Sequence, residues 1–261
     1  MSSNVATSVL PMFQDAILKV RWAAHNIKQF QDAVTSYTGY GVRMALVEAN
    51  PRQPFHRFMV ITEPLPFNSA LIAGDIVRNL RAALDHAVSA IYRAKQLSDG
   101  DAYFPIGDTR KDLCGTIKGR LEKNGFIALT PFFLDEIEAT ETGNCSLIWI
   151  LNQIDRANKH RSLIVVEEMV FTPMPDSHDL TRDIHISFNV NVLKPAQCNW
   201  WDIPEGGDVQ QHTNTKASLR VTFGPTEVMN GRDVIPSLEN FTQVVFQTIE
   251  KLSVAYAKAY P

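Results

Sequence analysis

The stretch Gly74–Tyr92, GDIVRNLRAALDHAVSAIY, constrains the fold of this chain more than any other part of its sequence. Its apolar residues recur at steps of three and four, which is the spacing of a helix with one face in a protein core. These positions are Ile72, Ile76, Leu80, Ala83, Leu84, Ala87, Val88 and Ile91. We therefore expect one long helix here, with the remaining elements packed around it.

The same helix carries a polar line at Asp75, Asn79, Ala82, His86, Ser89 and Arg93. Arg81 and Asp85 lie beside that line, four residues apart, which is the separation at which helix side chains form an ion pair. Asn79 and His86 are about 10 Å apart along the axis at ~1.5 Å per residue, which suits one ligand or one facing helix. A solvated face is the simpler interpretation. However, the scattered Lys and Glu of such a face are missing, so we expect the line to face another element.

A second helix is predicted at about Cys145–Arg161, with its core face at Leu147, Ile148, Ile150, Leu151, Ile154 and Ala157. Its polar residues form two lines, one of Asn152, Asp155 and Lys159 and the other of Arg156 and His160. Lys159, His160 and Arg161 lie in the last turn, where cations interact favourably with the helix dipole. The alternative is that Asp155 and His160 face the polar line of the first helix.

Composition places the chain among ordinary globular proteins, with 261 residues, 45% hydrophobic and 20% charged. The net charge of −3 gives no global positive field for a nucleic acid. Any RNA site would therefore be a local basic patch, and the most basic stretch, residues 109–125, carries Arg110, Lys111, Lys118, Arg120 and Lys123.

Cys114, Cys145 and Cys198 are odd in number, widely spaced and without CxxC or CxxH spacing. This pattern predicts a reducing compartment and no metal site, and no motif indicates a cofactor. The N-terminal segment does not have the pattern of a signal peptide. The sequence also contains no run of the ~18 apolar residues that are needed to span a bilayer. We therefore expect a cytoplasmic protein with no membrane partner.

The remaining segments predict a mixture of helices and strands. A helix over Pro11–Ser36 should be ended by Gly39 and Gly41, and a proline-rich loop should join the strand-like runs Val42–Glu48 and Phe55–Thr62 into a hairpin. Asp108 or Thr109 should cap a helix running to about Lys123, and Thr130-Pro131 should begin a short one. Later strands are predicted at Leu163–Phe171, Asp183–Val192 and Ala217–Phe223, with Lys194–Asn214, which contains Trp200-Trp201, as a loop.

Together these segments predict an α+β fold in a single domain over residues 1–261, because helices and strands do not alternate strictly. Its parts would be a small N-terminal hairpin, a helical bundle core at about 68–161, a β-rich part at about 162–235 and a closing helix at 236–260.

The two key helices resemble a family of uncharacterised bacterial and phage proteins. That family combines an NLRxxLDH helix, an FPI segment and a helix ending in DxxNKHR. Here these are Asn79-Leu-Arg81 with Leu84-Asp-His86, then Phe104-Pro-Ile106, then Asp155 with Asn158-Lys-His-Arg161.

More distantly, Arg81-x4-His86 resembles the Arg-x4–6-His signature of HEPN domains. These are helical bundles, usually dimeric, and many are metal-independent ribonucleases of toxin and antiphage systems. The resemblance implies that His86 would be the general acid or base and that Arg81, helped by Arg78, would stabilise the phosphate charge. Ala82 follows Arg81, where that family favours Asn, Asp or His; Asn79 does follow Arg78, but Arg78 is one residue too far from His86.

Three functions are compatible with these residues. The favoured one is a non-catalytic binding or structural module of a bacterial or phage protein, with a buried network between the two helices in which Asp85 and Asp155 satisfy Arg81, Arg156 or His160. Its partner would be another protein or a second copy. The alternative is a HEPN-like ribonuclease with catalytic residues Arg81, His86, Arg78 and Asn79, holding RNA phosphates with Lys159, His160 and Arg161. A metal-dependent hydrolase is disfavoured because neither helix contains HxxxH or ExxH.

Overall fold

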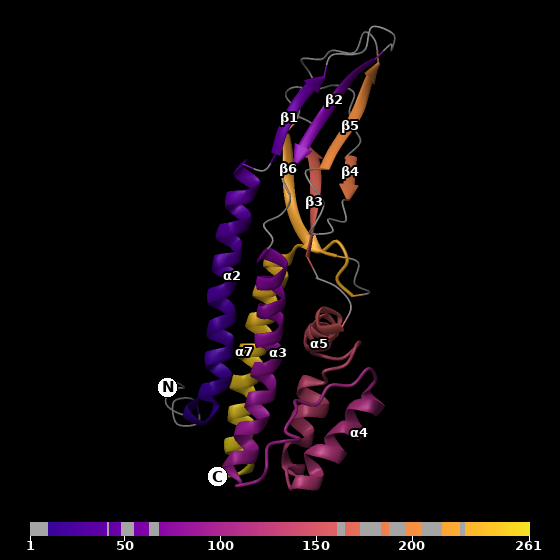
Figure 1. The fold of residues 1–261 in the computed structure, drawn as a ribbon. Helices are drawn as coiled ribbons and strands as arrows, with labels where there is room; N and C mark the ends of the chain where they lie inside the picture. The colour runs from indigo at the N-terminus through magenta and orange to yellow at the C-terminus, as the bar shows by residue number, and fades with distance from the viewer. Residues whose placement is uncertain are drawn as a thin grey trace, which may run out of the picture.

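Three long helices form the body of the protein in a computed structural model, which describes residues 10–40, 42–47, 55–62, 68–160, 165–172, 184–187, 197–204, 216–224 and 228–261. They are α2 (Gln14–Tyr40), which follows the short helix η1 (Leu10–Phe13), α3 (Asn68–Ala94) and α7 (Val234–Ala259). In Figure 1 they lie side by side, and α2 begins at the end of the bundle where α3 and α7 finish. The chain therefore runs along α2 in one direction and returns along α3 and α7.

The helix α3 is central because it packs against α2, α7 and α5. Its residues Leu80, Leu84 and Ile91 are fully buried, in a cluster shared with Phe13 of η1, Phe30 of α2 and the apolar face of α7. Burying one such side chain contributes about 1.5–3 kcal/mol relative to leaving it exposed. The periodicity read from the sequence is therefore the periodicity of the core, which confirms the prediction of one long helix over Gly74–Tyr92.

A smaller helical layer follows α3 and packs beside it. Thr109 caps α4 (Arg110–Arg120) in a reciprocal capping box with Asp112, as predicted for that start. The chain then passes through η2 (Glu122–Asn124), η3 (Ile127–Leu129) and the π-helical turn η4 (Phe132–Ile137) into α5 (Ser146–His160). The ring of Phe104 meets that of Phe133 edge-on at 5.4 Å, so the segment after α3 is held between the two layers.

Six strands lie beyond one end of the long helices (Figure 1). One antiparallel sheet has the order β1-β2-β5, from β1 (Val42–Val47), β2 (Phe55–Thr62) and β5 (Gln197–Pro204). The other has the order β4-β3-β6, from β3 (Val165–Thr172), β4 (Ile184–Ser187) and β6 (Lys216–Phe223). The predicted hairpin is confirmed by pairing of Val42 with Thr62 and of Val47 with Arg57, while its proline-rich turn lies outside the described residues.

The predicted α+β fold class is wrong, because the part of the protein that forms the core is helical. Of the residues whose side chains are described, 75% are helical and the only strand residues are 221–223, at the end of β6. The strands contribute only Val221, Thr222 and Phe223 to the buried residues described. The strand-like runs in the sequence therefore led us to expect a larger contribution of strands to the core than the described residues show.

Two local predictions are also wrong. The segment Lys194–Asn214 was expected to be a loop, yet Gln197–Pro204 is strand β5 and pairs with β2 along its length. Aromatic residues such as Trp200 and Trp201 favour strands, even where hydrophobic alternation is weak. Because β5 joins the N-terminal hairpin, the strands after α5 do not form a separate C-terminal part. Second, the helix was expected to stop after Ser36 at Gly39, but α2 passes through Gly39 and ends at Tyr40, directly before Gly41, the other glycine that was predicted to end it.

Candidate functional site

Arg81 and Asp85 are the centre of a polar network between α3, α5 and the segment that follows α3. The Arg81 Nη1 donates to the Asp85 Oδ1 at 2.6 Å, and the Arg81 Nε donates to the Asn152 Oδ1 on α5 at 3.0 Å. The same Asp85 oxygen accepts the backbone N–H of Phe104 at 2.8 Å. The predicted ion pair of Arg81 with Asp85 is therefore confirmed, and it ties together three parts of the chain.

This network is largely withdrawn from solvent. The side chain of Arg81 is 13% exposed and that of Asp85 is 27% exposed. Hydrogen bonds between charged groups at such sites are stronger than those between neutral groups, and a donor left without its acceptor there would be costly. The guanidinium is thus oriented by two acceptors on two helices, as expected of a group that fixes a helix–helix interface.

Asn79 turns to the other side of α3. Its amide oxygen accepts from the Lys19 Nζ on α2 at 3.0 Å, and its amide nitrogen donates to the backbone oxygen of Asp75 at 2.8 Å. Arg81 and Asn79 therefore contact opposite neighbours of the central helix. The structure does not bring them together as one group of site residues.

His86 and Arg78 are the remaining α3 residues of the predicted site. The side chain of His86 is half-buried, and that of Arg78 is exposed. Within the described part of the chain, neither side chain makes a hydrogen bond or an ion pair. His86 is adjacent to Asp85 in the chain, but the carboxylate binds Arg81 and Phe104 instead.

The predicted residues of α5 are only partly described. Asp155 is 2% exposed and therefore lies in the interior. Lys159 and His160 are the last two residues of α5, but their side chains, like the whole of Arg161, lie outside the described residues. Asn152, on the same polar line as Asp155, supplies the contact to Arg81 that the sequence had assigned to an aspartate.

Sequence reasoning missed three participants in this interface. The backbone N–H of Phe104 has no sequence signal, because a main-chain donor is present at every residue except proline. Asn152 was visible only as one member of a polar line. Gly74 lies against Asn158, and a glycine inside a strongly periodic helix was a signal for such a close approach.

The described surface offers no metal centre at these residues. No group of three or more His, Cys, Asp or Glu side chains in the described part of the chain is placed to hold a metal ion. Two surface hollows lie elsewhere, one between α2 and α7 and the other between α7 and the region of η4, and both are lined by other residues. No described helix is long and apolar enough to cross a membrane.

The predicted basic stretch is partly neutralised in the structure. The Arg110 guanidinium donates to the Asp135 Oδ1 at 2.5 Å and to the Glu138 Oε1 at 2.7 Å. The Arg120 guanidinium lies over the Tyr103 ring at 5.2 Å. Lys111, Lys118 and Lys123 are exposed. Three lysines thus remain as free cations of this stretch within the described residues.

Comparison of the chain with protein-family models, curated proteins and solved structures finds no match. A function for this chain must therefore be inferred from the geometry of the site.

Proposed function

We propose that the chain is a non-catalytic binding or structural module of the cytoplasm, in which the Arg81–Asp85 network fixes α5 against α3. The observation that supports this most is that the Arg81 guanidinium donates hydrogen bonds to both Asp85 and Asn152. A catalytic arginine must direct donors at a substrate, whereas these donors point at two acceptors within the protein. The module would bind its partner through other surfaces of the helical body.

The second feature behind the proposal is the position of Asp85. Its carboxylate orients Arg81 and accepts the backbone N–H of Phe104. Both contacts hold parts of the protein together. A carboxylate beside a phosphate site would also repel the substrate. Both facts favour an interface over a ribonuclease site built on the same turn of α3.

A protein partner fits the surface charge better than RNA does. The net charge is −3, and the cation of Arg110, in the most basic stretch, is engaged by two carboxylates. Nucleic acid affinity depends on the number of phosphates that free Lys and Arg can neutralise. The exposed lysines of α4 and η2 are few for that purpose.

The test compares catalysis and folding in the same variants. Wild type, His86→Ala and Arg81→Met are incubated with structured and single-stranded RNAs in EDTA, and their melting temperatures are measured. We expect no cleavage by any of them, a lower melting temperature for Arg81→Met and a smaller change for His86→Ala. Metal-independent cleavage by wild type that is lost in a folded His86→Ala variant would overturn the proposal in favour of the ribonuclease.

A further inference from the structure

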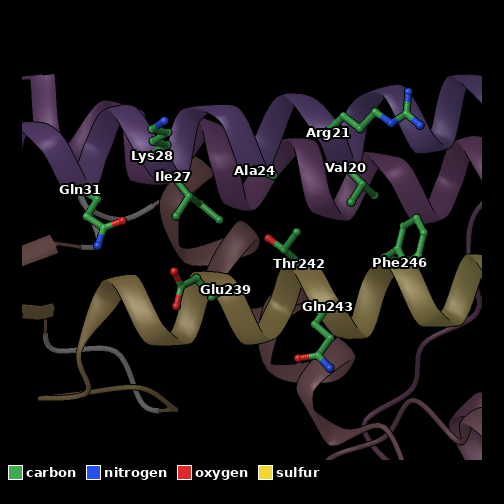
Figure 2. A pocket seen from close by; sticks show the side chains of 10 residues that line it. All are labelled: Val20, Arg21, Ala24, Ile27, Lys28, Gln31, Glu239, Thr242, Gln243 and Phe246. Carbon is green, nitrogen blue, oxygen red and sulfur yellow. The ribbon is translucent and has the colours of Figure 1, made fainter.

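The helices α2 and α7 leave an open groove between them on the outside of the bundle (Figure 2). The groove has a volume of about 580 Å³, and Val20, Ala24, Ile27 and Thr242 are among the residues that line it. Arg21 and Lys28 stand on its α2 side, and Glu239 stands on its α7 side. This surface is separate from the Arg81–Asp85 network, which lies between α3 and α5.

Exposed apolar side chains lie on the α7 side of this groove. Phe246 borders the groove and is 38% exposed, and Val254, two turns later on α7, is 39% exposed. Leu18 and Trp22 of α2 are also exposed, but they lie on the side of that helix that turns toward α3, because Asp15 and Lys19 on the same line bond to Arg93 and Asn79. Exposed apolar side chains gathered in one region are typical of an interaction surface.

The charges along the groove are sorted by helix. Arg21 and Lys28 are seven residues apart, so they lie on nearly one line of α2. Glu239, Phe246 and Glu250 are spaced by seven and four residues and share one line of α7 in the same way. None of these four charged residues makes an ion pair with another described residue. One side of the groove is therefore cationic and the other anionic.

Because α2 and α7 are antiparallel, early residues of one helix lie beside late residues of the other along the groove. Figure 2 shows Lys28 and Glu239 toward one end of the groove, and Arg21 and Phe246 toward the other. A two-fold axis parallel to the helices, placed outside the groove, would therefore bring α2 of one copy against α7 of the other at the same level. Lys28 would face the partner's Glu239, and Arg21 would lie near the partner's Phe246, about one turn from its Glu250.

We infer that this α2–α7 face is the interface of a symmetric homodimer, which closes an antiparallel four-helix bundle around Phe246 and the charges on either side of the groove. The charge pattern selects the occupant. A polyanion would be repelled by the Glu239 side, and a uniformly basic segment by the Arg21 side. A second copy presents both signs in the complementary order, and each contact occurs twice across a two-fold axis.

The inference does not depend on the proposed function, because neither helix face carries a residue of the Arg81–Asp85 network. Its test is a charge swap followed by sedimentation equilibrium of the full chain over a range of concentrations. We expect wild type to reach twice the mass of one chain. Lys28→Glu and Glu239→Lys should each weaken the dimer at least about tenfold, because each puts like charges across the axis. The double variant should recover most of the loss, since both pairs are restored with reversed sign.

Matched controls make the same charge changes elsewhere, at exposed sites. Lys111→Glu on α4 and Glu141→Lys before α5 should leave the dimer constant unchanged. Melting curves check that each variant is folded, and Lys28→Gln with Glu239→Gln replace any reversal that fails to fold and should weaken the dimer more mildly. Three outcomes would overturn the inference. They are a wild type that stays monomeric at every concentration, a dimer indifferent to changes at Lys28 and Glu239, and a double variant no tighter than the single ones.

Discussion

Gly74 of α3 faces the side chain of Asn158 on α5, and a Cβ built at Gly74 would lie 2.6 Å from the Asn158 amide nitrogen and 2.9 Å from its oxygen. Real Cβ atoms do not approach other heavy atoms this closely, so the amide would have to move. The glycine thus leaves room for the Asn158 amide between α5 and the central helix, one side of which also carries Arg81. The two contacts lie two turns apart on α3, at the same interface.

Gly74→Ala should therefore give no gain in stability, although alanine inside a helix is ordinarily better than glycine by about 1 kcal/mol. The displacement of the Asn158 amide offsets the gain in helix propensity. Urea unfolding followed by circular dichroism measures the difference.

Gly115→Ala on α4 is the matched control, since a Cβ there meets nothing within 4 Å. That variant should be more stable than wild type by roughly the full propensity difference of about 0.5–1 kcal/mol. Adding Asn158→Ala to Gly74→Ala should recover stability, because the obstructing amide is gone. Equal gains for the single Gly74 and Gly115 variants would show that α5 does not press on α3 at this point.

Asp85→Ala should destabilise the protein more than Arg81→Met does. The first change removes the acceptor of two donors, Arg81 and the backbone N–H of buried Phe104, and costs about 3 kcal/mol. The second leaves Asp85 with the Phe104 bond and costs about 2 kcal/mol. A double-mutant cycle on Arg81 and Asp85 should return a coupling energy of about 1 kcal/mol or more. The reverse order of the two single variants would contradict the architectural role of Asp85.

Arg110→Met should have little effect, although Arg110 makes two short ion pairs with Asp135 and Glu138. The Arg110 side chain is 51% exposed, and exposed ion pairs contribute little because water and salt screen them. The fall in melting temperature should be clearly smaller than for Arg81→Met and should vanish in high salt. A fall as large as that of the buried pair would show that the α4–η4 contact is a main support of the fold.

Local features of the fold could be read from the sequence because they depend on neighbours along the chain. The apolar period of α3, the ion pair four residues apart and the Thr109 capping box are all of this kind. The continuation of α2 through Gly39 was missed because the cost of one helical glycine, about 1 kcal/mol, is small beside the packing of the whole helix.

Partners across an interface could not be read in the same way. A central helix has neighbours on several sides, so the polar residues of α3 divide between Lys19 on α2 and Asn152 on α5. Periodicity gives the line on which a residue lies but not the element that faces it. Strand β5 was missed for a related reason, since its pairing with β2 joins residues far apart in the sequence.

Tyr92 supplies a pH-dependent prediction. Its ring is buried, its hydroxyl donates to the Arg120 backbone oxygen at 2.6 Å, and burial raises the pKa of Tyr92 above its ordinary value. The folded protein therefore holds this proton more tightly than the unfolded chain does. The corresponding stability is fully present below the unfolded pKa of about 10 and is lost as the pH rises through the folded pKa.

Tyr92→Phe should consequently lower stability by about 0.5–1.5 kcal/mol at neutral pH, through loss of the bond to Arg120. Above about pH 10 the difference from wild type should shrink. Unfolding of the wild type then releases the Tyr92 proton, so its stability falls as the pH rises, whereas the Phe variant has no such proton to release. Urea unfolding at a series of pH values measures both effects. Tyr103→Phe, which removes a phenolic hydroxyl at an exposed position, is measured alongside as the control. A Tyr92→Phe profile parallel to that of wild type through the alkaline range would mean that Tyr92 is free to ionise in the folded state.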